Sequence, residues 1–301
     1  MREDATTAFR SPAGARTVQD AYDETVRALL PDVEHIRIGL PSSSSRPAMT
    51  VHALAAGPLD APPVVLLHGS GATAAGWAAE LTGLSADHRL LALDLPGEPG
   101  DPSGTRLPLS PGVHASWLGA VVRELGVERP VLVGESLGGW VALDAASAAP
   151  HLPRAVVLVS SSGIGPRRTA PLLVAGLLAV AGRSGRARAL SYLTGPHPTS
   201  GTTGPSPLAT LALTTFAHFS PRTDPLPVFD DAALSAITAP VWALYGARDR
   251  MLDAPAAARR ADTALAGGHV ELISDAGHLL PGRASRVERA VRDAEAGSER
   301  G

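Results

Sequence analysis

Short, largely apolar runs recur along this chain and limit its fold more than any other feature. The first is Pro63-Val64-Val65-Leu66-Leu67, and others lie at residues 90–93, 131–133, 155–159, 241–245 and 270–273. A strand that is apolar at every position is covered on both faces, which is typical of a parallel sheet between helices. Helical patterns lie between the runs, at residues 74–85, 113–125, 137–149, 254–265 and 286–294. This alternation predicts an α/β fold with a doubly wound sheet.

The first part of the chain has a different pattern. Apolar residues recur at helical spacing over residues 17–30, immediately before Pro31, which predicts an amphipathic helix. Two β-like runs follow at residues 35–40 and 48–55. We therefore expect residues 1–32 to form an N-terminal helical extension ahead of the sheet.

Residues 163–239 interrupt the alternation, because several helix-like pieces are separated only by clusters of Gly, Pro and Thr. An unstructured loop of that length is implausible in a compact domain. We predict a helical cap inserted into a core formed by residues 33–162 and 240–296, with a tail at 297–301. One apolar set in the cap is expected to form its buried core, or alternatively to line an acyl pocket: Leu172, Leu173, Val174, Leu177, Leu178 and Val180.

Several absences exclude classes of function. The 301 residues include no Cys, Lys or Asn, which excludes disulfides, thiolate nucleophiles, Cys-zinc sites and Schiff-base lysines. The net charge of −3 gives no reason to expect nucleic acid as a partner. No apolar run follows Met1, and the most apolar stretch, 170–181, is shorter than the ~18–20 residues that cross a bilayer. We expect a cytoplasmic protein without a membrane span; its oligomeric state stays open.

Gly134-Glu135-Ser136-Leu137-Gly138 has the pattern G-x-S-x-G, between the apolar run 131–133 and a helical pattern. A serine on such a tight strand-to-helix turn projects above the sheet, and Gly134 and Gly138 leave room for neighbouring backbone. An ordinary glycine-rich turn is the alternative. We expect Ser136 to be a nucleophile.

Acyl transfer also needs two N–H donors for the developing oxyanion. The residue after the nucleophile, Leu137, supplies one candidate. The loop His68-Gly69-Ser70-Gly71, which follows the apolar run 63–67, supplies the other at Ser70. A simple turn is again the alternative, and we expect His68 itself to be packed rather than catalytic.

A serine nucleophile needs a base, and the base needs an orienting acid. His278 follows the run 270–273 and Asp249 follows the run 241–245, so both lie where the carboxyl edge of the sheet is expected. Asp253 is a second candidate for the acid, or a residue at a helix start. Other histidines are expected at the surface or in loops: His52, His88, His151, His197 and His269. For His218, an orientation toward the pocket is an alternative, based on its location alone.

These motifs, with Asp94-Leu95-Pro96-Gly97, resemble the α/β-hydrolase superfamily in its capped, serine esterase-like branch. The resemblance spans about residues 49–296. It implies an eight-stranded, mostly parallel sheet, a lid after the sixth strand, and neither a metal nor an organic cofactor. One position departs from the family pattern, since Glu98 stands where members often carry His after D-x-P-G.

Three hypotheses for function follow. The first is a serine hydrolase that cleaves a carboxylic ester of a small, mainly apolar molecule through Ser136, His278 and Asp249. The second is a carbon–carbon bond hydrolase, lyase or cyclisation enzyme that uses the same three residues. The third is a non-catalytic ligand receptor on the same scaffold. The fold cannot distinguish them, because substrate choice depends on the cap and loops.

Overall fold

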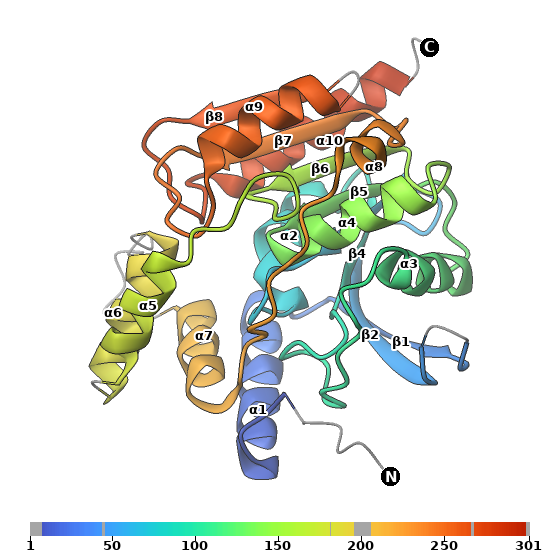
Figure 1. The fold of residues 1–301 in the computed structure, drawn as a ribbon. Coiled ribbons are helices and arrows are strands. Elements are labelled where there is room, and N and C mark those ends of the chain that lie inside the picture. The colour runs from blue at the N-terminus through green and yellow to red at the C-terminus, as the bar shows by residue number, and fades with distance from the viewer. Residues whose placement is uncertain (1–7, 44–45, 181, 196–205, 266–267, 299–301) are drawn as a thin grey trace.

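The computed structural model describes residues 8–43, 46–180, 182–195, 206–265 and 268–298. Its strands form one eight-stranded sheet in the order β1-β2-β4-β3-β5-β6-β7-β8 (Figure 1). β2 pairs antiparallel with both β1 and β4, and all other neighbouring strands are parallel. The expected α/β fold with a mostly parallel, eight-stranded sheet is therefore confirmed. The strands are β1 (Glu34–Leu40), β2 (Met49–Ala56), β3 (Pro63–Leu67), β4 (Arg89–Leu93), β5 (Val131–Glu135), β6 (Ala155–Val159), β7 (Val241–Gly246) and β8 (His269–Ile273).

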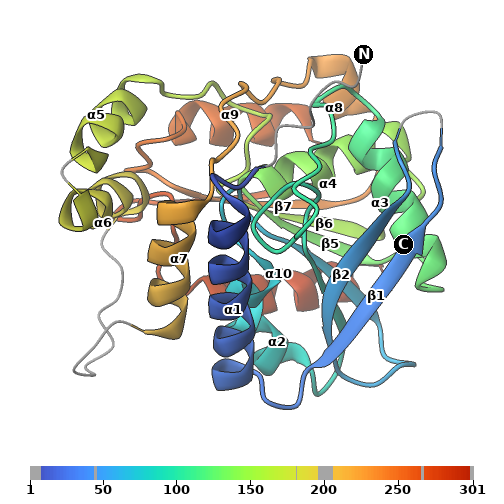
Figure 2. The ribbon, with the colours of Figure 1, turned by 90° about the horizontal axis from the view of Figure 1, so that it is seen from below.

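Helices cover both faces of the sheet, and each central strand divides its side chains between the two layers. In β3, Val65 and Leu67 belong to the apolar layer of α3, α4 and α9, whereas Val64 and Leu66 belong to that of α1, α2 and α10. Because successive residues of a strand point to opposite faces, an unbroken apolar run is satisfied only by this two-sided arrangement. Figure 2 shows α1, α2 and α10 gathered on one side of the sheet. The helices of the two layers are α1 (Pro12–Leu29), η1 (Ala74–Trp77), α2 (Ala78–Leu84), α3 (Val113–Glu124), α4 (Leu137–Ala148), α9 (Ala254–Ala264) and α10 (Arg283–Ser298).

The predicted strands agree with the structure to within two residues at each end. The terminal helices are longer than their apolar patterns. α1 begins at Pro12, where the Ser11 hydroxyl caps it by accepting the N–H of Gly14 across 3.0 Å. α10 ends at Ser298, so the helix includes the first two residues of the expected tail, and residues 299–301 lie outside the described part.

In the described part of the segment expected to form a cap, four helices lie between β6 and β7: α5 (Ala170–Ala179), α6 (Gly182–Thr194), α7 (Pro207–His218) and α8 (Asp231–Ser235). α5 and α6 pack side by side (Figure 1). The expectation that the apolar set of α5 is buried is wrong for the side chains described, because Leu173, Leu177 and Val180 are 72%, 78% and 85% exposed. Leu178 is half-buried and lines a cavity of about 630 Å³ between α6 and the loops after β7 and β8.

The N-terminal segment holds α7 against the core. α1 packs along α7, as both views show. Backbone hydrogen bonds join Ser220 N–H to Ala8 C=O across 2.8 Å and Arg10 N–H to His218 C=O across 2.9 Å. The rings of Phe9 and Phe219 meet edge to face at 5.4 Å between their centres. Among the described residues, no helix is long and apolar enough to cross a bilayer.

Candidate active site

Ser136 lies on the turn between β5 and α4, in a backbone conformation that side chains rarely adopt, with φ of 52° and ψ of −107°. The turn is tight enough to require glycine on both sides. A Cβ at Gly134 would lie 2.4 Å from the carbonyl oxygen of Gly138, and a Cβ at Gly138 would lie 2.0 Å from that of Leu67. The predicted strand-to-helix turn is therefore present, and its geometry is that of a nucleophile elbow.

His278 and Asp249, which are 29 positions apart in the chain, form a buried hydrogen-bonded pair. The Nδ1 of His278 lies 2.7 Å from Asp249 Oδ2, and the two residues are 5% and 1% exposed. The other carboxylate oxygen of Asp249 accepts the N–H groups of Met251 and Leu252 at 2.6 and 3.1 Å. With three hydrogen-bond contacts, Asp249 is fixed as an acceptor toward the imidazole.

The loop carrying His278 is fixed in turn by the Ser160 hydroxyl, which donates to the carbonyl of His278 across 2.7 Å. Burial alone would lower the pKa of His278, but the hydrogen bond to Asp249 and the charges of Asp249 and Glu135 raise it above its ordinary value. An imidazole held this way readily accepts a proton at its other nitrogen, which general-base catalysis requires.

One small cavity, of about 60 Å³, brings together the predicted nucleophile, base and oxyanion donors. Asp249 lies behind His278 and does not line the cavity. The lining residues are Ser70, Ser136, Leu137, Ser162, Arg167, Arg222, Asp224, Leu226, Met251, Leu252 and His278. Apolar side chains and two arginines therefore surround the predicted nucleophile.

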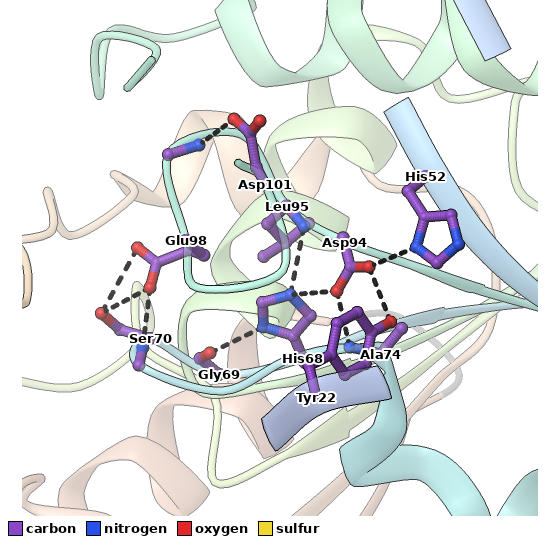
Figure 3. A network of polar contacts seen from close by, with 12 residues as sticks. Tyr22, His52, His68, Gly69, Ser70, Ala74, Asp94, Leu95, Glu98 and Asp101 are labelled. Atoms are coloured by element: carbon purple, nitrogen blue, oxygen red, sulfur yellow. Dashed lines mark hydrogen bonds and ion pairs between the residues drawn. The ribbon is translucent and has the colours of Figure 1, made fainter. Parts of the chain in front are cut away.

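The loop after β3 passes close to Ser136, since a Cβ at Gly69 would lie 3.4 Å from the Cβ of Ser136. His68 is packed, as expected. Its Nδ1 lies 2.8 Å from the carbonyl of Gly69, and its Nε2 accepts the N–H of Leu95 across 3.1 Å (Figure 3). His68 thus ties this loop to the segment after β4, and burial lowers its pKa.

Asp94, the residue after β4, anchors this region through contacts from separate elements. Its carboxylate accepts the hydroxyl of Tyr22 and the N–H of Ala74, both at 2.8 Å, and lies 2.8 Å from Nδ1 of His52 (Figure 3). The expectation that His52 is a surface or loop residue is therefore wrong, because β2 directs it onto this carboxylate.

Glu98 occupies the position where the sequence departs from the family pattern, and it supports the predicted oxyanion loop. Its carboxylate accepts the N–H of Gly71 at 2.7 Å and the hydroxyl of Ser70 at 3.3 Å (Figure 3). The side chain is buried, and burial raises the pKa of Glu98 from 4.5 to about 7, although Gly71 N–H and the charges of Arg106 and Arg222 oppose the rise. Sequence reasoning marked Glu98 as an anomaly but gave it no partner.

A buried cluster of charges lies directly behind the nucleophile elbow. Arg283, the first residue of α10, binds Glu80 through Nε at 2.8 Å and Glu135 through Nη1 at 2.9 Å. Its guanidinium also lies 4.3 Å from the ring centre of Trp77. Because Glu135 immediately precedes Ser136, this cluster connects the elbow to the helix that follows the His278 loop.

None of the other histidines in the described part of the chain lines the cavity. His88 is buried and contacts Glu295 at 3.0 Å, which corrects the expectation of a surface position. His218 faces α1 rather than the pocket, since a Cβ at Gly14 would lie 3.1 Å from its ring. His197 is outside the described residues. Within those residues, no group of three His, Cys, Asp or Glu side chains gathers in a way that would hold a metal.

Comparison with known proteins agrees with this geometry. Residues 64–290 match the sequence pattern described as "Alpha/beta hydrolase family". Carboxylesterase YbfK of Bacillus subtilis is 27% identical over 241 residues, which cover 76% of this chain and 78% of that protein. Esterase Rv0045c of Mycobacterium tuberculosis is 33% identical over 158 residues, covering 52% and 49% of the two chains.

The fold is also that of solved structures. The crystal structure of naproxen esterase from Bacillus subtilis superimposes with a TM-score of 0.76 and covers 93% of this chain and 97% of that one. Its sequence is 23% identical to this chain, so this likeness concerns the fold.

Proposed function

Because the chain belongs to the alpha/beta hydrolase family, we propose that it is a serine hydrolase that cleaves a carboxylic ester through Ser136, His278 and Asp249. The observation that carries the proposal is the buried His278–Asp249 pair, whose imidazole lines the same cavity as Ser136. Two similar proteins are a carboxylesterase and an esterase, which supports ester hydrolysis over other reactions of the family.

In the proposed reaction, the Ser136 oxygen attacks the ester carbonyl while Nε2 of His278 takes the hydroxyl proton. Nδ1 keeps its own proton and donates it in the hydrogen bond to Asp249, whose negative charge stabilises the imidazolium. The N–H groups of Ser70 and Leu137 stabilise the oxyanion. Collapse of this intermediate breaks the bond to the alcohol oxygen, and the leaving alcohol takes the proton from His278.

Water then completes the cycle. His278 removes a proton from a water molecule, whose oxygen attacks the acyl-enzyme, and the acid is released as Ser136 regains its proton. The apolar lining by Leu137, Leu226 and Met251 suits a small, mainly apolar molecule.

The decisive experiment is the substitution S136A, tested with a fluorophosphonate probe and a panel of p-nitrophenyl esters from acetate to octanoate. We expect the wild-type protein to be labelled and to turn over at least one ester, and S136A to lose both. S147A, which alters another serine of α4, serves as the matched control and should keep both activities.

Three outcomes would contradict the proposal. Full labelling of S136A would refute the nucleophile. Turnover of a 1,3-diketone but of no ester would assign the site to carbon–carbon bond hydrolysis, and labelling without turnover of any compound would favour a receptor.

A further inference from the structure

Arg222 is a buried cation at the cavity whose hydrogen-bonding capacity is largely unused. The residue belongs to the segment between α7 and α8, and its side chain is only 8% exposed. Nη2 donates to the carbonyl of Leu107 across 2.8 Å, and Nε is buried without a partner among the described residues. A guanidinium carries five N–H donors, so most of its donor capacity remains available.

The carboxylates near Arg222 do not satisfy it. Asp224, which also lines the cavity, forms only a long ion pair with Arg222: its Oδ2 lies 3.7 Å from Nη1, beyond hydrogen-bond distance, and its side chain is 68% exposed. Glu98 attracts Arg222 electrostatically, but its carboxylate is already bound by Gly71 and Ser70. Arg106 repels the same cation.

Two further observations point to an anion as the missing partner. Burial lowers the pKa of Arg222, as expected for a cation whose lost hydration is incompletely replaced. Arg167, which is exposed, lines the same cavity, so two arginines face the single lining carboxylate of Asp224. Buried charges are ordinarily paired, and arginine pairs best with a planar carboxylate.

We propose that Arg222 binds a carboxylate of the substrate, so that the preferred ester is a half-ester of a short dicarboxylic acid. The inference rests on the proposed function and deepens it. Because Arg222 and Ser136 line the same small cavity, a short half-ester is the kind of molecule that presents its carboxylate to one and its ester carbonyl to the other. The substrate is then apolar except for one negative charge.

The test compares two esters of the same shape, monoethyl succinate and ethyl succinamate. The first carries a carboxylate where the second carries a neutral amide. We expect wild-type kcat/KM to favour the half-ester at least about tenfold. R222M should lower the ratio of the two kcat/KM values by about 10–100-fold, the usual weight of a charge-assisted hydrogen bond. R222K should recover part of the ratio, because it keeps the charge but not the planar fork. D224N should raise the ratio of the two kcat/KM values, since the substitution removes a competing carboxylate.

R260M is the matched control. Arg260 also holds the cap by donating to the carbonyls of Ile164 and Phe229, at 2.8 and 2.7 Å, but it does not line the cavity. The ratio of the two kcat/KM values for R260M should equal that of the wild type. Melting temperatures of all variants separate misfolding from lost recognition, and R222K still decides the question if R222M fails to fold.

A binding measurement separates this inference from the proposed function. Calorimetry on the S136A protein should detect succinate but not succinamide, and S136A/R222M should bind neither. Succinate binding to S136A without ester turnover by the wild type would uphold the anion site and refute the esterase. Ester turnover with equal kcat/KM for the two esters, and no succinate binding, would overturn the anion site and leave the esterase standing.

Discussion

The imidazole of His278 and the carboxylate of Asp249 meet across 2.7 Å, and both side chains are almost entirely removed from solvent. D249N would keep an oxygen for the N–H groups of Met251 and Leu252, but its amide would donate toward His278 and favour the wrong tautomer. We expect kcat to fall about 10³–10⁴-fold with little loss of stability. The pH at half-maximal kcat/KM should also fall, because Asp249 raises the pKa of His278.

D253N distinguishes the two candidate acids of the sequence. The Asp253 carboxylate caps α9 by accepting the N–H of Ala256 across 3.2 Å. The amide oxygen of Asn accepts the same N–H, so we expect D253N to change stability by less than about 0.5 kcal/mol and to retain ester turnover. A loss of kcat in D253N as large as that in D249N would show that the acid has been assigned to the wrong residue.

The elbow glycines should tolerate no side chain. G138A would bring a Cβ to 2.0 Å from the backbone oxygen of Leu67, so we expect a loss of more than about 3 kcal/mol, or no soluble protein. G119A is the contrast, because a Cβ at Gly119 of α3 meets nothing within 4 Å. It should stabilise the protein by about 0.5–1 kcal/mol in urea unfolding. Equal stability of the two variants would contradict the described turn.

Glu98 should make stability depend on pH with a defined sign. The unfolded chain releases this proton near pH 4.5 and the folded chain near pH 7, so the folded state binds more protons between these values. The contribution of Glu98 to stability therefore falls as pH rises through this interval, by up to about 3 kcal/mol. E98Q removes that loss.

The measurement is urea unfolding of wild type and E98Q at pH 4.5 and pH 8. The free energy of unfolding of E98Q, relative to that of the wild type, should be higher at pH 8 than at pH 4.5. E128Q, which changes an exposed glutamate, is the control and should follow the wild type at both values. A constant difference between E98Q and wild type would show that Glu98 is ionised throughout the range.

Removing Arg283 should destabilise the protein, because two buried carboxylates behind the elbow depend on its charge. R283M would leave Glu80 and Glu135 without their cation, and we expect the free energy of unfolding to fall by about 3–5 kcal/mol. The triple variant E80Q/E135Q/R283M should recover much of this loss. R292M, which breaks an exposed pair with Asp87 on the same helix, should change stability by less than about 1 kcal/mol. A triple variant as unstable as R283M would contradict this account.

The sequence predicts features that depend on local pattern. The apolar runs define the strands, and the positions of Ser136, Asp249 and His278 directly after strands explain why topology brings them to one edge of the sheet. Glu98 and Arg222 lie in irregular segments, where no periodicity indicates which way a side chain points. Their partners, Gly71 and Leu107, are far away in the chain, so those contacts emerge only from the folded arrangement.

The burial of the apolar residues of α5 is predicted wrongly for a related reason. A helix that is apolar on every side has no polar face to indicate which side is covered. Leu173 and Leu177 are exposed because α6 packs on only part of α5. His52 shows the converse, since this polar strand residue is half-buried and its ring contacts the carboxylate of Asp94.

The pairing of residues 8–10 with residues 218–220 makes the start of the chain part of the cap. A protein shortened to begin at β1 would keep every strand and all three proposed catalytic side chains, yet α7 would lose its backbone anchor. The segment carrying Arg222 begins where that anchor ends, so trimming the N-terminus would alter substrate choice before it altered the chemistry. The structural support of α7 thus extends beyond residues 64–290, the stretch that the family pattern matches.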